Sequence, residues 1–194
     1  LLVEVFHVYK GEGQVEATPL TSIYTDEGCG ENRIEIGGIL YRTEEAYFDF
    51  IGHTVTYFYR REQGMETVIY LHDKHPNAEF SIDFDRVSQL TETQLLFTED
   101  KKDRKKTIEK YATFLYNGKL KDFAAIDTNV SSGNVTLIDS DNDDRYEIVN
   151  ITEYVHGVVS GFSKGEFQVY TQQNHTFDLK AEKGIRMVEI YADG

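Results

Sequence analysis

Residues 133–151 read Gly-Asn-Val-Thr-Leu-Ile-Asp-Ser-Asp-Asn-Asp-Asp-Arg-Tyr-Glu-Ile-Val-Asn-Ile, with an apolar, β-branched run on each side of an acidic turn. This pattern predicts a β-hairpin, because runs rich in Val, Ile and Thr form strands where Asp, Asn and Ser clusters bound them. The same order of features occurs about 80 residues earlier, where residues 52–59 and 67–71 flank the turn 60–64. We therefore expect a fold built from repeated β modules.

A shorter hairpin is expected before each of these long ones. Residues 34–41 contain Gly37-Gly38 and residues 112–120 contain Asn117-Gly118, and both dipeptides favour two-residue hairpin turns. Residues 44–51 and 121–128 follow the short hairpins and are expected to form one or two helical turns. Three further stretches are predicted from local composition: a turn at residues 11–13, a strand over residues 14–25 that Pro19 bends, and a solvated loop at residues 101–106.

The repeat predicts three parts of the chain: a first β module at residues 1–84, a second at 85–156, and a partial third at 157–194. In the third part, strands are expected at residues 158–159, 167–170, 176–179 and 185–191, with a turn at 164–165. These strands either begin a third module or complete a neighbour. The predicted fold class is mostly β, with tandem small barrels or bent sheets of about 80 residues, because five or six strands must protect their edges.

Composition limits the classes of partner. The formal charge is −14, which argues against a nucleic-acid partner because a phosphate backbone needs a basic face. Cys29 is the single cysteine, so no intrachain disulfide forms, and a cytosolic, Gram-positive surface or virion location fits this. No run approaches the roughly 18 apolar residues of a membrane span. Leu1 opens directly into an apolar run, as expected for a segment of a longer protein.

The best candidate for chemistry is the acidic turn of the second long hairpin. Carboxylates at Asp139, Asp141 and Asp143, with the backbone carbonyl of Arg145, have the alternate spacing with which a loop supplies oxygen ligands to Ca²⁺. Two residues depart from the EF-hand pattern: Asp144 stands where that loop has glycine, and Asn150 stands at its twelfth position. The alternative is an acidic turn without a ligand, since Asp and Asn tolerate turn geometry.

Several other residues have types found in functional sites, but each has a plainer structural interpretation. The histidines of His72-Asp-Lys-His75 are more simply loop residues than a metal pair, and Cys29 between two glycines has no identifiable base. Asp83 and Asp85 have the residue type of glycosidase acids, but 34 acidic residues make chance pairs common. Alternation places Tyr57 and Tyr59 on one strand face, where core packing is more common than stacking on a sugar.

The block from Gly133 to Tyr154 resembles β repeats in large surface proteins of Firmicutes, which are often attached to S-layer homology modules. It is also similar to segments of structural proteins of phages that infect such bacteria. The resemblance is strongest over residues 116–159 and weaker over 34–72. It implies a non-catalytic building block of an extracellular, cell-surface or virion assembly, and it carries no site residue over to this chain.

Together these features predict a non-catalytic structural or interaction module that contacts protein partners, including copies of itself, and needs no cofactor. A calcium- or carbohydrate-binding surface module is the alternative, based on the acidic turn and the tyrosines. A hydrolase domain with a carboxylate pair is a third hypothesis.

Overall fold

The fold is mostly β, and its helical parts are short 3-10 turns. The structure, a computed structural model, describes residues 7–75, 78–130 and 132–154, together with the backbone of three strands beyond them. Two compact units divide the chain, Leu1–Glu153 and Tyr154–Gly194. In the described part of the chain, no helix is long and apolar enough to cross a membrane.

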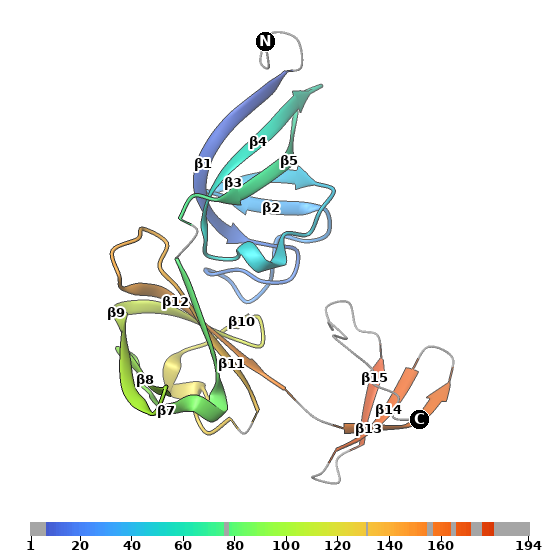
Figure 1. The fold of residues 1–194 in the computed structure, drawn as a ribbon. Helices are drawn as coiled ribbons and strands as arrows, with labels where there is room; N and C mark the ends of the chain where they lie inside the picture. Colours follow the sequence, from blue (N-terminus) through green and yellow to red (C-terminus); the bar gives the residue numbers. More distant parts are fainter. Residues whose placement is uncertain are drawn as a thin grey trace. The chain divides into compact units, whose positions relative to one another are not determined.

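The first sheet of unit 1 is a closed barrel with the strand order β1-β2-β3-β5-β4 (Figure 1). β3 runs parallel to β5, whereas the other neighbouring strands are antiparallel. The 3-10 turn η1 (Phe48–Phe50) leads into β4. The strands of the barrel are β1 (Val8–Ala17), β2 (Arg33–Ile36), β3 (Ile39–Thr43), β4 (Thr54–Glu62) and β5 (Met65–Asp73).

Tyrosines fill part of the barrel interior. The hydroxyls of Tyr41 and Tyr57 lie 2.8 Å apart and form a buried hydrogen bond, and the ring of Tyr59 packs on both. Burial and the hydrogen bond to Tyr57 raise the pKa of the Tyr41 hydroxyl. Gly11 lies against this cluster, because a Cβ on it would come within 2.4 Å of the Tyr57 ring.

The second sheet has the strand order β6-β11-β12-β9-β8-β7, with β10 paired to β9. Its main core contains Leu95, Phe97, Val135, Leu137 and Val149, all of them buried. The elements are β6 (Glu79–Asp83), η2 (Phe84–Arg86), β7 (Val87–Leu90), β8 (Gln94–Glu99), β9 (Lys102–Tyr116), β10 (Lys119–Leu120), η3 (Phe123–Ala125), β11 (Gly133–Ile138) and β12 (Tyr146–Glu153).

The two sheets share one pattern of strand pairing. In the first, β1 pairs with β4 through its first part and with β2 through its last residues. In the second, β6 and β7 divide these roles, because β6 pairs with β11 and β7 pairs with β8. A hairpin (β2–β3 or β8–β9), a parallel pair (β3–β5 or β9–β12) and a closing hairpin (β4–β5 or β11–β12) complete both.

A third apolar cluster joins the two sheets. Ile23 and Ile51 come from the first barrel, and Leu115, Ile138 and Ile148 come from the second sheet. All five are at most 5% exposed. Burying a side chain of this size contributes about 1.5–3 kcal/mol. This cluster is therefore a small hydrophobic core that packs the two sheets of unit 1 against each other.

The described backbone of unit 2 forms three antiparallel strands, β13 (Gly157–Ser163), β14 (Glu166–Thr171) and β15 (Thr176–Lys180). Three of the strands expected in this region, at residues 158–159, 167–170 and 176–179, fall within these elements. The turn expected at 164–165 and the strand expected at 185–191 lie outside the described residues.

Several local predictions are confirmed and three are wrong. The hairpins at Gly37-Gly38 and Asn117-Gly118 form, and all four of these residues have positive φ. Residues 11–13 are not a turn, because they continue β1 across β4. The strand expected over residues 14–25 ends at Ala17, where β1 stops. Residues 101–106 are not a loop, because Asp100 and Lys101 alone turn the chain and β9 begins at Lys102.

Candidate functional site

The candidate site is the acidic loop that connects β11 to β12. The buried carboxylate of Asp139 folds this loop, since its two oxygens accept hydrogen bonds from the backbone N–H groups of Asp143 and Asp144 at 3.0 and 2.8 Å. Asn142 and Asp144 have φ angles of 65° and 67°, the left-handed geometry that Asn and Asp tolerate best after glycine. The loop is therefore a tight, internally hydrogen-bonded turn.

Four carboxylates converge in this loop. One oxygen from each of Asp139, Asp141, Asp143 and Glu147 lies within 4.8 Å of the other three. Burial raises the pKa of Glu147, the hydrogen bonds from the Ser140 N–H and hydroxyl at 2.7 and 2.8 Å act in the opposite direction, and the charge of Asp141 raises it further. Like charges at this separation repel, and a hard divalent cation is the species that would neutralise them.

The arrangement fits an oxygen-ligated cation better than the EF-hand pattern suggests. Asp144 adopts the positive φ for which that loop uses glycine, so its presence is no obstacle. The fourth carboxylate is Glu147, at the ninth position of the loop, whereas Asn150 lies within β12. Ca²⁺ takes six to eight oxygen ligands, so further oxygens must complete the set that the four side chains begin. The backbone carbonyl of Arg145 remains a predicted ligand. The Arg145 side chain points elsewhere, with its Nη1 3.3 Å from Glu109.

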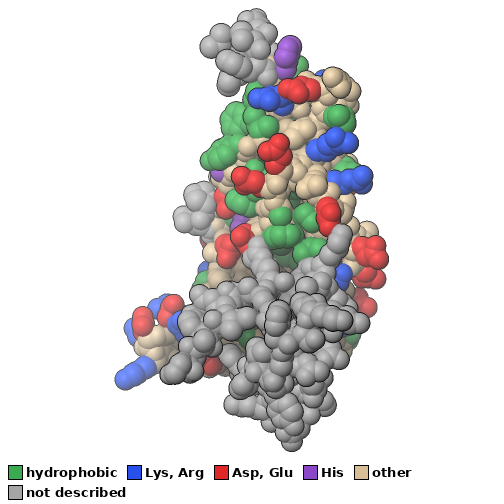
Figure 2. Space-filling model, turned by 90° about the vertical axis from the view of Figure 1, so that its right-hand side faces the viewer, with side chains coloured by type: hydrophobic (Ala, Val, Ile, Leu, Met, Phe, Trp, Pro, Cys, Tyr) green, Lys and Arg blue, Asp and Glu red, His purple; other side chains and the backbone are tan. Residues whose placement is uncertain are grey.

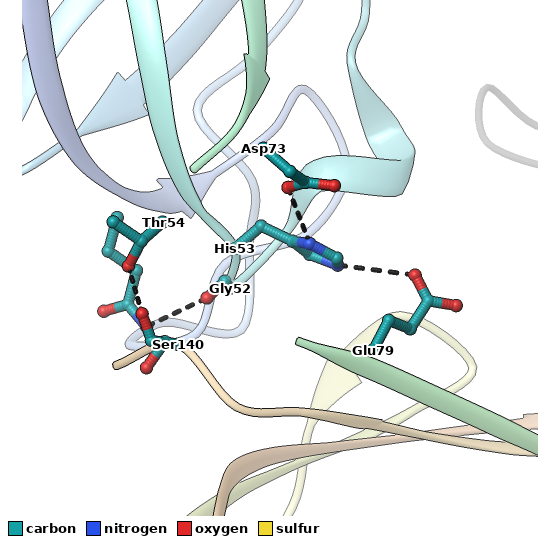
Figure 3. A network of polar contacts seen from close by, with 7 residues as sticks. Gly52, His53, Thr54, Asp73, Glu79 and Ser140 are labelled. Atoms are coloured by element: carbon teal, nitrogen blue, oxygen red, sulfur yellow. Dashed lines mark hydrogen bonds and ion pairs between the residues drawn. The ribbon is translucent and has the colours of Figure 1, made fainter. Parts of the chain in front are cut away.

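The loop is tied to the junction between the two sheets through Ser140. The hydroxyl of Thr54, at the start of β4, donates a hydrogen bond of 2.5 Å to the backbone carbonyl of Ser140 (Figure 3). The same Ser140 donates to Glu147, one of the four converging carboxylates. A cation held in the loop would therefore act on the segment that contacts the first barrel.

A buried histidine lies beside this connection. The Nδ1 atom of His53 is 2.9 Å from Asp73 at the end of β5, and its Nε2 atom is 3.6 Å from Glu79 at the start of β6 (Figure 3). Next to it, the side-chain amide of Gln14 donates to the carbonyl of Gly52 at 3.0 Å. His53 thus contacts one carboxylate from each sheet.

The other candidate residues occupy ordinary positions. His72 is exposed beside the Tyr70 ring, and neither His72 nor His75 belongs to a group of three or more ligating side chains among the described residues. Burial raises the pKa of Cys29, which weakens it as a nucleophile. The carboxylates of Asp83 and Asp85 are exposed, and Tyr57 and Tyr59 belong to the tyrosine cluster of the first barrel.

Sequence reasoning missed two of these residues. Glu147 continues the alternate spacing of Asp139, Asp141 and Asp143 by four more positions, so the signal was present in the loop itself. His53 gave no signal, because Asp73 and Glu79 reach it only through the folding of β5 and β6. No known protein family, curated protein or solved structure matches this chain.

Proposed function

We propose that this chain is a non-catalytic structural segment of a larger extracellular, cell-surface or virion assembly, in which it acts as a rigid connector. Its parts are tandem β modules of about 80 residues, of the kind found in Firmicute surface proteins and in structural proteins of their phages. The shared pairing pattern of the two sheets supports this organisation, since β6 and β7 together match β1.

The buried junction is the observation that carries the proposal. A flexible string of modules leaves the ends of its barrels exposed to solvent, whereas Ile51 and Ile148 meet here in an apolar cluster. Hydrogen bonds from Thr54 to Ser140 and from the Lys119 ammonium to the Asp26 carbonyl add fixed points across the same junction. Rigid packing of this kind transmits position along an assembly.

Amide ¹⁵N relaxation of the full chain tests this proposal. We expect residues of β1–β5 and residues of β6–β12 to tumble with one common rotational correlation time, because the junction holds them as one body. Two separate correlation times would mean that the sheets move independently, and the connector role would then be withdrawn.

The convergence of four carboxylates favours a second candidate function, calcium binding by the acidic loop. On this proposal Ca²⁺ braces the junction, because Glu147 accepts from Ser140 and Ser140 accepts from Thr54. A ligand that binds only the folded state raises stability by about 2.7 kcal/mol at a hundredfold excess over Kd.

Thermal unfolding in EDTA and then in excess Ca²⁺ checks this second function. Asp141→Asn is the sharpest variant, since Asp141 is exposed and has no hydrogen bond to another described residue, so the turn should survive. Glu92→Gln, at an exposed carboxylate outside the loop, is the matched control. A Ca²⁺-dependent rise in Tm that Asp141→Asn abolishes and Glu92→Gln retains supports the site, and equal Tm values with and without Ca²⁺ leave the loop as a turn.

A further inference from the structure

A groove opens on the first barrel where two strands diverge. β3 and β5 pair only at Arg42–Thr67 and Thr43–Val68, and on one side of these pairs the strands separate. The resulting groove has a volume of about 380 Å³. Its lining includes Arg33, Leu40, Arg42, Met65 and Glu66.

Two arginines of the groove make no ion pair with the described part of the chain. Arg33 and Arg42 lie directly opposite each other on β2 and β3, and both are exposed. Neither guanidinium has an ion pair or a side-chain hydrogen bond with a described residue. Glu66, the acidic residue of the groove, is already bound by the guanidinium of Arg61. Two like charges in this cross-strand position are unfavourable, and they are conspicuous in a chain whose formal charge is −14.

Apolar side chains lie next to these arginines. Leu40 is 50% exposed and Met65 is 42% exposed, and Ile39 at the neighbouring turn is also exposed. Methionine adapts its shape to an incoming apolar side chain, and arginine binds carboxylates through two parallel hydrogen bonds. Figure 2 shows hydrophobic side chains beside both basic and acidic ones in the upper part of the view, on the first barrel.

We propose that this groove binds an extended acidic peptide segment of a partner protein. Carboxylates at alternate positions of the segment pair with Arg33 and Arg42, and an apolar side chain two residues further on, on the same face of the segment, packs on Leu40 and Met65. The inference rests on the proposed role as an assembly module and names the surface through which the first barrel contacts its neighbour. Charge complementarity selects this occupant, because the two arginines face each other without a partner among the described residues.

Fluorescence anisotropy tests the proposal with the full chain and a short labelled peptide that carries Glu, Glu and Leu at alternate positions with serine between them, so that all three side chains lie on one face. We expect Arg33→Gln and Arg42→Gln each to weaken binding by about tenfold, as loss of a charge-assisted pair predicts. Arg104→Gln, which changes an exposed arginine of β9 that lies 3.9 Å from Glu99, should leave binding unchanged. The first two variants should also keep or raise Tm, because they remove a repulsion.

Four results would overturn the inference. They are a Kd above the millimolar range, equal binding of a peptide with glutamine in place of glutamate, tighter binding of single-stranded DNA, and self-association that Arg33→Gln abolishes. The last would place a second copy in the groove. If the chain does not bind the peptide but its two sheets tumble as one body, the peptide-binding proposal is wrong and the connector role stands. If the two sheets tumble separately, the connector role is wrong.

Discussion

Gly52 and Ile148 are in direct contact across the junction, since a Cβ atom on Gly52 would lie 2.3 Å from the Cδ1 atom of Ile148. Gly52 also has a φ angle of 83°, which a side chain rarely adopts. Residue 52, two positions before β4, is therefore glycine for two separate reasons: the local backbone conformation and the close approach of the second sheet.

Substitution of Gly52 by alanine should separate these two reasons. We expect Gly52→Ala to lower the free energy of unfolding by about 2–4 kcal/mol, from backbone strain and overpacking together. Gly64→Ala is the matched control, because Gly64 has a φ of 79° with no heavy atom within 4 Å of its added Cβ. Urea unfolding measures both, and the control should show the strain alone.

Shortening Ile148 should partly rescue the Gly52 variant. Ile148→Val removes the Cδ1 atom that the new methyl group meets, and alone it should cost about 0.5–1.5 kcal/mol. In the Gly52→Ala background the same change should cost less than that or stabilise the protein. Additive effects of the two substitutions would show that the contact does not exist.

Gly11 makes a similar prediction for the first barrel. Gly11→Ala should destabilise the chain by about 1–3 kcal/mol, because its Cβ would enter the ring of Tyr57. Lys10→Ala, at the adjacent exposed position of the same strand, should change the unfolding midpoint in urea only slightly. Equal stability of the two variants would contradict the close approach of β1 to the tyrosine cluster.

The hydroxyl of Tyr116 should lose its proton only at a pH well above that of an ordinary tyrosine, because its pKa is raised. Its hydroxyl donates a hydrogen bond of 2.6 Å to Glu153, and this bond, together with burial, raises the pKa of Tyr116 to about 12. Because the folded state holds this proton more tightly than the unfolded state, the stabilisation is complete below pH 10 and is lost as the pH rises towards 12. The ¹³Cζ shift of Tyr116 reports the titration, and Glu153→Gln should lower that pKa.

Glu147 links the metal proposal to pH. Burial raises its pKa from the ordinary 4.5, so without metal its ionisation destabilises the folded state as the pH rises through the folded pKa. Ca²⁺ requires the ionised form. Glu147→Gln should therefore keep or raise the neutral-pH Tm in EDTA and lose the rise caused by Ca²⁺. A Ca²⁺-dependent rise that survives the substitution would remove Glu147 from the ligand set.

The hairpins were predictable because the residues of their turns favour the turn geometry by themselves. Contacts between residues distant in sequence could not be predicted in this way. Gly37-Gly38 and Asn117-Gly118 favour their turns by themselves, so sequence alone located those hairpins. Gly11 resembles a turn glycine because the reason for it, the Tyr57 ring, arrives only when β4 pairs with β1.

The candidate sites divide in the same way. The spacing of Asp139, Asp141 and Asp143 was visible as a ligand pattern. The cross-strand pairing of Arg33 with Arg42 follows from the register of a two-residue turn. The groove beside them could not be predicted, because it depends on how β3 diverges from β5. The contact of His53 with Asp73 and Glu79 exists only in three dimensions.

Pulsed electron–electron double resonance measures whether the two sheets of unit 1 are held at a fixed distance, as a rigid connector requires. Spin labels at Glu44→Cys in the first barrel and Lys105→Cys in β9, in a Cys29→Ser background, use two exposed positions. We expect a single narrow distance distribution in the full chain. A broad distribution, in a protein whose circular dichroism shows both sheets folded, would contradict it.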